Sequence, residues 1–279
     1  MPGVEKDRDE VIGLIAGGGK FPWMVARAAR RQGVRVAAVA HRGETDPALA
    51  ENVDEIRWVR LGQLGGMVKA LRKMGVHKAL MAGTISKKRM FVDLRPDFRG
   101  AAFISKRAIL HDDDVLRALA QELSEEGIEI VSSTAYLPEL MAPIGCLTKK
   151  RPGKRESEDI QLGWRIAKEL GRLDIGQCVV LRNRTVLALE AIEGTDCTIR
   201  RGGELAREKA VVVKVSKPNQ DLRFDMPTVG LETLRVMIEV KASVLAIEAG
   251  KTLVFDRDEM IAGADRARIA IVSLENSDW

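Results

Sequence analysis

Two short polar loops in the C-terminal half of the chain contain the side chains best suited to chemistry. Glu193–Asp196 follows the apolar run Val186–Ile192, and Lys217–Asp225 follows the apolar run Val211–Val215. The loops hold carboxylates, an ammonium group and a guanidinium at predicted strand ends, a combination that suits a phosphorylated ligand and a hard cation. Because ligands of α/β sheets usually bind at the carboxyl ends of strands, we expect a ligand site here.

Four charged residues of these loops are candidates for phosphate chemistry. Asp196 and Asp225 could hold a cation such as Mg²⁺, and Lys217 and Arg223 could neutralise the charge of a phosphate. Both carboxylates also have a structural alternative, since Asp196 could cap the helix that follows it and Asp225 could cap a helix that starts at Pro227. The three histidines form no Ser/His/Asp or HExxH pattern, which argues against a nucleophilic triad.

The N-terminal half alternates strand and helix patterns. Val11–Ala16 is an apolar strand, Gly17–Gly19 forms a turn, and a helix with Pro22 in its first turn ends near Gly33. A second strand follows at Val34–Ala40, and the alternation continues beyond it. This order predicts an α/β fold with a parallel, Rossmann-like sheet.

The glycine turn is a candidate phosphate-binding site, although it lacks the dinucleotide-binding fingerprint. Pro22 stands where the third glycine of G-x-G-x-x-G belongs, and the second strand ends in His41-Arg42 instead of an acidic residue. No GK[ST] sequence follows, which excludes a P-loop. The alternative is a tight turn that needs glycine for steric reasons only.

Composition limits the partners and the compartment. The formal net charge of +5 gives a mild preference for anionic partners, and 4% aromatic residues argue against recognition of nucleic acid by base stacking. Cys146, Cys178 and Cys197 form no CxxC pair, so neither a disulfide nor structural zinc is expected. The charged N-terminus has no apolar signal core, and no apolar run approaches about 20 residues. We therefore expect a cytoplasmic protein, at most peripheral on a membrane.

The composition changes at residues 148–158, TKKRPGKRESE, where basic residues surround a proline and a glycine. Such a segment suits an exposed linker. We therefore expect an N-terminal domain at residues 1–147 and a C-terminal α/β domain at residues 148–279. Beyond this segment, one helical face predicts a buried stripe of Ile160, Trp164, Ala167 and Leu170.

Five segments together resemble the LpxI family, the metal-dependent UDP-2,3-diacylglucosamine pyrophosphatases of lipid A synthesis. They are GLIAGGGKFP, HDDDVLR, GRLDIGQ, ALEAIEGTD and KPNQDLRFDMPTVG, and they run from Gly13 to Gly230 in the order of the family. The glycine turn alone is a weak signal. EGTD followed by KPxQxxRxDxPTxG is the most specific part of the resemblance.

The resemblance implies a Rossmann-like N-terminal domain joined to a family-specific α/β domain. It implies that water cleaves the pyrophosphate of UDP-2,3-diacylglucosamine to UMP and 2,3-diacylglucosamine 1-phosphate (lipid X), with Mg²⁺ or Mn²⁺ as cofactor. The essential aspartate of the family falls on Asp225. Peripheral contact with the inner membrane and a homodimer are further expectations, whereas nucleic acid is not an expected partner.

These arguments give a defined set of site residues. The catalytic candidates are Asp225, Asp196, Lys217 and Arg223, and Asp225 and Asp196 are also the metal candidates. The substrate-binding candidates are Gly17, Gly18, Gly19, Asp113, Asp114, Thr195, Gln220 and Thr228. Asp113 alternatively caps the helix Val115–Ser124.

Two other classes of function remain open at this stage. One is an oxidoreductase that uses a nicotinamide cofactor or a nucleotide sugar on the same sheet. The other is a non-enzymatic module that binds lipid or nucleic acid through the basic segment 148–158. Tight NAD binding would favour the first, and ligand binding without turnover would favour the second.

Overall fold

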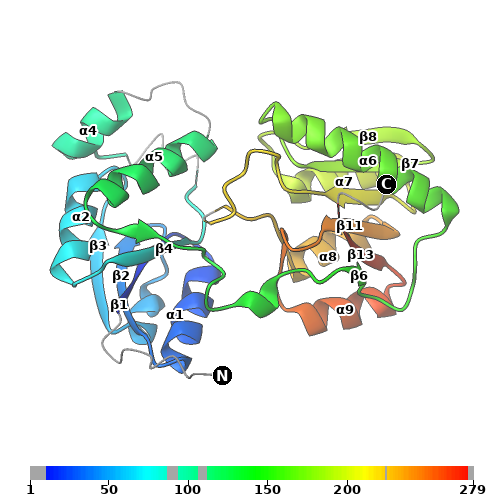
Figure 1. Ribbon diagram of the computed structural model, residues 1–279. Coiled ribbons are helices and arrows are strands. Elements are labelled where there is room, and N and C mark those ends of the chain that lie inside the picture. The colour runs from blue at the N-terminus through cyan, green and yellow to red at the C-terminus, as the bar shows by residue number, and fades with distance from the viewer. Residues whose placement is uncertain (1–10, 87–93, 106–111, 224, 276–279) are drawn as a thin grey trace. The chain divides into compact units, whose positions relative to one another are not determined.

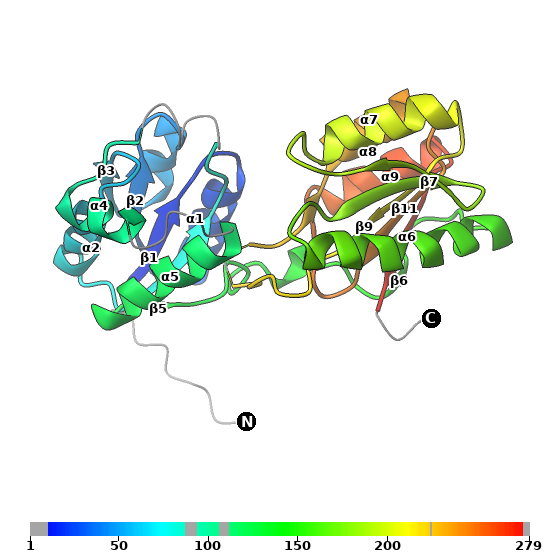
Figure 2. The ribbon, with the colours of Figure 1, turned by 90° about the horizontal axis from the view of Figure 1, so that it is seen from above.

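The protein divides into two compact units, Met1–Pro138 and Glu139–Trp279, each with its own central sheet (Figures 1 and 2). The computed structural model describes residues 11–86, 94–105, 112–223 and 225–275, with the backbone alone at residues 112 and 113. The division at residue 138 precedes the boundary expected after residue 147. The reason is that strand β6 (Gly145–Cys146) already pairs with the sheet of the second unit.

The first unit is built on a parallel sheet with the strand order β3-β2-β1-β4-β5. Its elements are β1 (Val11–Ala16), α1 (Phe21–Arg31), β2 (Arg35–His41), η1 (Pro47–Asn52), β3 (Glu55–Val59), α2 (Leu64–Lys73), β4 (Lys78–Ala82), α4 (Phe98–Ser105), α5 (Asp112–Glu125) and β5 (Glu129–Ile130). The central strands β1, β2 and β4 are buried along nearly their whole length, as expected for a parallel sheet covered on both faces. The predicted Rossmann-like sheet is therefore confirmed.

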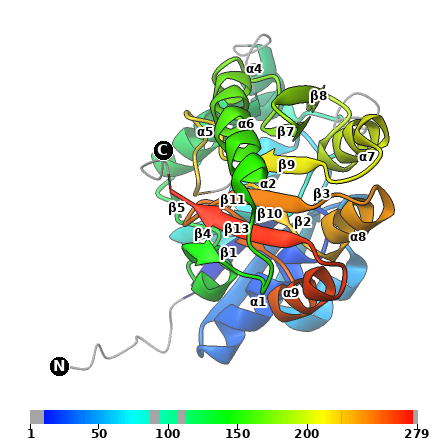
Figure 3. The same ribbon diagram turned by 90° about the vertical axis from the view of Figure 1, so that its right-hand side faces the viewer.

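The second unit contains a six-stranded mixed sheet with the order β6-β13-β11-β9-β7-β8 (Figure 3). Its elements after β6 are α6 (Lys154–Arg172), β7 (Cys178–Arg182), β8 (Thr185–Leu189), α7 (Thr195–Ala206), β9 (Val211–Lys214), β10 (Thr228–Val229), α8 (Leu231–Glu239), β11 (Val244–Glu248), β12 (Leu253–Val254), α9 (Arg257–Arg266) and β13 (Ala270–Leu274). β9, β11 and β13 are parallel, whereas β7 runs antiparallel to both β9 and β8. β8 therefore ends at the same edge of the sheet as β9.

Side-chain alternation along the strands divides the core of the second unit into two layers. On β7, Val179 and Leu181 pack with Trp164 of α6, whereas Cys178 and Val180 pack on the opposite face, where α7, α8 and α9 lie (Figure 2). The predicted apolar stripe of α6 is confirmed, because all four of its residues are buried: Ile160, Trp164, Ala167 and Leu170.

The β7–β8 hairpin turn is fixed by a buried carboxylate. Asn183 and Arg184 have φ values of 50° and 62°, the positive values that a two-residue hairpin turn requires. Asp159 of α6 is 3% exposed, and its carboxylate accepts the Asn183 and Arg184 amides at 2.9 and 2.5 Å. This turn lies at the edge of the sheet opposite to the ends of β8 and β9.

Two local expectations are wrong. The segment 148–158 is not a linker throughout, because α6 begins at Lys154 and the buried Thr148 hydroxyl accepts the Ile271 amide at 2.9 Å. No helix starts at Pro227 either. Thr228 belongs to β10, which pairs with β12, and α8 begins only after Gly230.

Among the described residues, no helix is both long and apolar enough to span a membrane.

Candidate functional site

The two polar loops leave the six-stranded sheet on the side where the parallel strands β9, β11 and β13 have their carboxyl ends, and we call this side the edge of the site. β8 ends at Leu189 and β9 at Lys214, and both ends lie beside the start of β7. Gln177, which precedes β7, contacts both exits: its carbonyl accepts the Val215 amide at 3.1 Å, and its amide donates to the Glu190 carboxylate at 3.0 Å. The ligand edge expected from the sequence is thus formed by both loops together.

The loop that follows β9 is closed by one glutamine side chain. Gln220 is buried, its Oε1 accepts the Lys217 amide at 3.0 Å, and its Nε2 donates to Oδ2 of Asp225 at 2.7 Å. The Asp225 amide also donates to the Asp221 carbonyl at 3.1 Å. Gln220, a predicted substrate-binding residue, therefore holds the first and last residues of the loop together.

Asp225 and Asp196 retain carboxylate oxygens that accept no hydrogen bond within the described part of the chain. For Asp225 this is Oδ1, and for Asp196 it is both oxygens. Capping does not account for Asp225, since the N-cap of α8 is Gly230. The N-cap of α7 is Gly194, and Asp196 lies in the first turn, where the helix dipole favours a carboxylate. Both side chains are therefore able to accept a ligand.

The two predicted cations of the loop are each paired with a carboxylate. Lys217 Nζ lies 2.5 Å from Oδ1 of Asp174, and both side chains are largely buried. Arg223 contacts the Asp221 carboxylate at 2.7 Å from a half-exposed position. A phosphate at this edge would therefore share Lys217 and Arg223 with existing partners.

The two predicted threonines tie neighbouring segments to the same edge. Thr195 Oγ1 donates to Oε1 of the buried Glu190 at 2.7 Å, which fixes the start of α7 beside the end of β8. The Thr228 carbonyl accepts a hydrogen bond from Nζ of the buried Lys214 at 2.8 Å, which fixes β10 beside the end of β9.

The edge also contains a buried ion pair that sequence reasoning missed. Glu248 ends β11 with a side chain 2% exposed, and its Oε2 lies 2.6 Å from Nζ of Lys168 on α6. The same oxygen accepts the amide and hydroxyl of Ser216 at 2.9 and 2.7 Å, while Oε1 accepts Lys251 Nζ at 2.9 Å. The only sign of this ion pair in the sequence is Glu248 itself, a single carboxylate at the end of the apolar run VLAIE.

Burial and hydrogen bonding set the ionisation of these groups. Burial alone would raise the pKa of Glu248, but the hydrogen bonds from Lys168, Lys251 and Ser216 hold that pKa below its ordinary value of 4.5. Burial lowers the pKa of Lys168, against the opposing effect of Glu248. Burial raises the pKa of the Cys178 thiol, so this cysteine stays protonated and is not a nucleophile.

The donors present fit a hard cation that shares its ligands with a bound phosphate. No group of three or more His, Cys, Asp or Glu side chains in the described ranges could hold a metal ion by itself. Mg²⁺, however, is commonly bound by one or two carboxylates together with substrate phosphates and water. The free oxygens of Asp225 and Asp196 suit that arrangement, and a metal held by protein alone does not fit.

The glycine turn of the first unit is used for packing against the end of β4. The amides of Gly17 and Gly18 donate to the carbonyls of Ala82 and Thr84 at 2.8 and 2.7 Å. A Cβ on Gly17 would lie 2.6 Å from the Thr84 carbonyl oxygen, so only glycine allows this approach. Gly19 has a φ of +83° with open space around its Cα, and phosphate binding there stays a prediction.

The two predicted substrate-binding aspartates of HDDDVLR, Asp113 and Asp114, lie at the start of α5. Asp114 is 3.6 Å from Arg117 one turn later, and the side chain of Asp113 lies outside the described residues. His41, at the end of β2, places Nδ1 3.0 Å from the Ala16 carbonyl, and burial lowers its pKa. A role in substrate binding for Asp113 and Asp114 stays a prediction.

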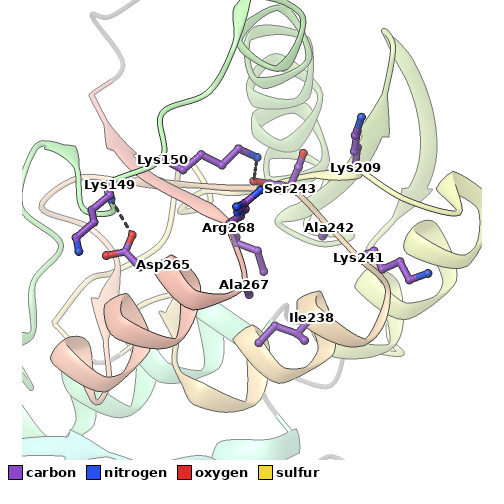
Figure 4. A pocket seen from close by; sticks show the side chains of 11 residues that line it. Lys149, Lys150, Lys209, Ile238, Lys241, Ala242, Ser243, Asp265, Ala267 and Arg268 are labelled. Atoms are coloured by element: carbon purple, nitrogen blue, oxygen red, sulfur yellow. Dashed lines mark hydrogen bonds between the residues drawn. The ribbon is translucent and has the colours of Figure 1, made fainter.

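An open cationic pocket lies at the opposite edge of the six-stranded sheet (Figure 4). Three cations precede the parallel strands there: Lys209 before β9, Lys241 before β11 and Arg268 before β13. Lys149 and Lys150 complete the pocket, in which Lys150 donates to the Ser243 carbonyl at 3.1 Å. Lys241 and Arg268 also follow the ends of α8 and α9, where the helix dipole favours cations.

Comparison with known protein families assigns both units. The model described as the LpxI N-terminal domain matches residues 11–140, and the model described as the LpxI C-terminal domain matches residues 143–272. A relative from Caulobacter vibrioides, UDP-2,3-diacylglucosamine pyrophosphatase LpxI, is 34% identical over 275 residues, which cover 95% of this chain and 97% of the relative.

Similarity to solved structures is much weaker. A biotin carboxylase from Campylobacter jejuni is 12% identical over 70% of this chain and 42% of that chain, with a TM-score of 0.29. The biotin carboxylase domain of a 2-oxoglutarate carboxylase from Hydrogenobacter thermophilus is 15% identical over 62% of this chain and 35% of that chain, with a TM-score of 0.26. Neither likeness supports an argument about this protein.

The Glu248 contacts predict how stability depends on pH. Because the pKa of Glu248 is lowered in the folded protein, its contribution is complete above pH 4.5 and is lost as pH falls through the folded value. Glu248→Gln should lower the free energy of unfolding by about 3–5 kcal/mol at pH 7, since Lys168 is left without its buried partner. The difference between wild type and variant, measured by urea unfolding, should shrink below pH 4.5. A difference that stayed constant down to pH 3 would contradict this account.

Proposed function

The chain belongs to the LpxI family, and on that premise we propose that it hydrolyses the pyrophosphate bond of UDP-2,3-diacylglucosamine. The products are UMP and 2,3-diacylglucosamine 1-phosphate (lipid X), and the reaction is a step of lipid A biosynthesis. The observation that supports this most directly is the similarity of nearly the whole chain to a relative named for that activity. The C-terminal family match spans both loops of the site.

The arrangement of the site suits pyrophosphate hydrolysis. This reaction asks the protein for charge neutralisation and an oriented water, with little covalent chemistry. Oδ1 of Asp225 is available to accept a hydrogen bond from the attacking water, while Gln220 holds the other oxygen in place. The N-terminus of α7 directs backbone amides and the positive end of its dipole to the same edge, where the phosphates would bind.

The other charged residues of this edge have further roles in the proposed reaction. Asp225 and Asp196 would hold a divalent cation, Mg²⁺ or Mn²⁺, which would supply neutralisation of the phosphate charge. Lys217 keeps positive charge at the start of the loop despite its pairing with Asp174. Arg223 is half-exposed and is therefore able to exchange Asp221 for a phosphate oxygen.

Incubation of the pure protein with UDP-2,3-diacylglucosamine and Mg²⁺ should release UMP, and excess EDTA should stop the release. Chromatography of the nucleotide product measures both effects. Full turnover in EDTA would remove the cation from the proposal. If no UMP formed with any divalent cation, the pyrophosphatase proposal would fail, and micromolar NAD binding would then favour the oxidoreductase alternative.

Asp225→Ala should lower kcat by at least about 10²-fold, the scale of losing one preorganised electrostatic group. KM should change far less, because most of the substrate lies away from one carboxylate. Thermal unfolding should stay near that of wild type, since Asp225 is not a helix cap and has one side-chain hydrogen bond. Asp258→Ala, which removes an exposed carboxylate from the first turn of α9, is the matched control. Near-normal kcat in a destabilised Asp225→Ala protein would indicate a purely structural residue.

We further propose that the cationic pocket contacts anionic lipid headgroups at the inner membrane. Lys149, Lys209, Lys241 and Arg268 form no ion pair with described residues, and Figure 4 shows the three lysines pointing outward in different directions. Contact there leaves the loops at the opposite edge of the sheet uncovered. A second basic segment of the sequence, Lys87–Arg89, is also expected to contact such a membrane, but it lies outside the described residues.

The protein should therefore co-sediment with anionic liposomes at low salt and stay in the supernatant at high salt. Each basic residue at such a surface contributes roughly 1 kcal/mol, so Lys209→Glu should weaken binding at least about fivefold. Lys69→Glu on α2 changes the net charge by the same amount outside the pocket and should leave binding near wild type. Equal effects of the two variants would show that net charge alone drives the association.

A further inference from the structure

The loop that carries Asp225 begins at a residue whose polar groups are all bonded to the buried ion pair. Ser216 is 2% exposed; its amide and hydroxyl donate to Glu248, and its carbonyl accepts Lys168 Nζ at 2.9 Å. Lys168 comes from α6 and Glu248 from the end of β11, so two separate elements hold the base of the loop.

The bonds continue from this base to the catalytic candidate. Lys217 follows Ser216 directly, pairs with Asp174 beyond the end of α6, and donates its amide to Gln220. Gln220 in turn donates to Asp225. At the same point a Cβ on Gly171 would lie 3.0 Å from Cα of Lys217, so the end of α6 packs closely on the start of the loop.

Stability alone gives no reason for an ion pair at this place. Removing two charges from water costs more than most buried pairs regain, and apolar residues of similar size are often equally stable or better. The Lys168–Glu248 pair nevertheless shares four hydrogen bonds with one residue, Ser216, at the base of the loop. Its geometry is that of a support for the loop.

We infer that Lys168 and Glu248 are positioning residues for the proposed hydrolysis, acting through Ser216 to fix the loop that carries Asp225. The inference rests on the proposed function for its catalytic consequence. The structural consequence, protection of the backbone amides at residues 216–223 and 225, is measurable without any substrate. Neither residue is assigned a contact with the reacting atoms.

Hydrogen exchange tests the structural consequence. Glu248→Gln should increase amide exchange at residues 216–225 and leave the hairpin turn at residues 182–185 unchanged. Asp159→Asn is the matched control, because it also neutralises a buried carboxylate of the second unit, but one that contacts the hairpin turn at the opposite edge. It should increase exchange at the hairpin turn and leave exchange in the loop with Asp225 unchanged. Equal protection of residues 216–225 in wild type and Glu248→Gln would overturn the inference.

Turnover tests the catalytic consequence. Well below its melting temperature, Glu248→Gln should lower kcat for UMP release by about 10²-fold, the effect of displacing a reacting group by about 1 Å, with little change in KM. Asp159→Asn should keep kcat near wild type. A kcat loss of the same size in both variants would overturn the inference, because it would follow stability instead of loop position.

Two further variants decide the case if Glu248→Gln does not fold. Ser216→Ala removes the two hydrogen bonds of the hydroxyl, to Glu248 and Lys168, and should lower kcat by about tenfold. The double variant Lys168→Met with Glu248→Met removes both buried charges and leaves only the half-exposed Lys251 without its partner. It should still have low kcat, because Ser216 loses the partners of its amide, hydroxyl and carbonyl. Recovery of kcat in the double variant would overturn the inference. A wild type that releases no UMP would refute the proposed function instead, and the exchange result would still decide whether the pair orders the loop.

Discussion

The carboxylate of Glu248 is the contact on which the candidate site depends most directly. One of its oxygens contacts the ammonium group of Lys168 on α6 and accepts two hydrogen bonds from Ser216, at the base of the loop with Asp225, and Glu248 itself ends a central strand. A buried charge of this kind is tolerated only while its partners stay in place. The electrostatic requirement therefore fixes a helix, a strand and a loop relative to one another within the second unit.

The order of strands determines why this edge holds so many polar groups. In a purely parallel sheet, helices and loops alternate regularly at the carboxyl ends of the strands, as in the first unit. In the second unit the β7–β8 hairpin reverses the chain, so that β8 ends at the same edge of the sheet as β9, with β7 between them. The start of α7 therefore lies at the same edge of the sheet as the end of β9, and the positive end of its dipole favours the carboxylate of Asp196 in its first turn.

Much of this arrangement could be predicted from the sequence. Apolar runs that end in polar loops gave the strand ends, the alternation of elements gave the parallel sheet, and the motif KPxQxxRxDxPTxG singled out Asp225. The ion pair could not be predicted, because Lys168 and Glu248 are 80 residues apart and each is ordinary in its local sequence. The segment 148–158 was misjudged as a linker because the first turns of α6 carry exposed charges, and exposed charges are equally typical of a linker.

Gln220 makes the loop with Asp225 sensitive to deamidation, the slow hydrolysis of a side-chain amide. Its side chain accepts a hydrogen bond with one atom and donates one with the other, and only the amide nitrogen can face Asp225. Hydrolytic loss of ammonia from this side chain would leave a glutamate of nearly the same shape. Two carboxylates at this distance repel each other, so the contact between residue 220 and Asp225 that closes the loop would be lost. The aged molecule would keep its fold, yet Asp225 would no longer be held in the position proposed for cation binding.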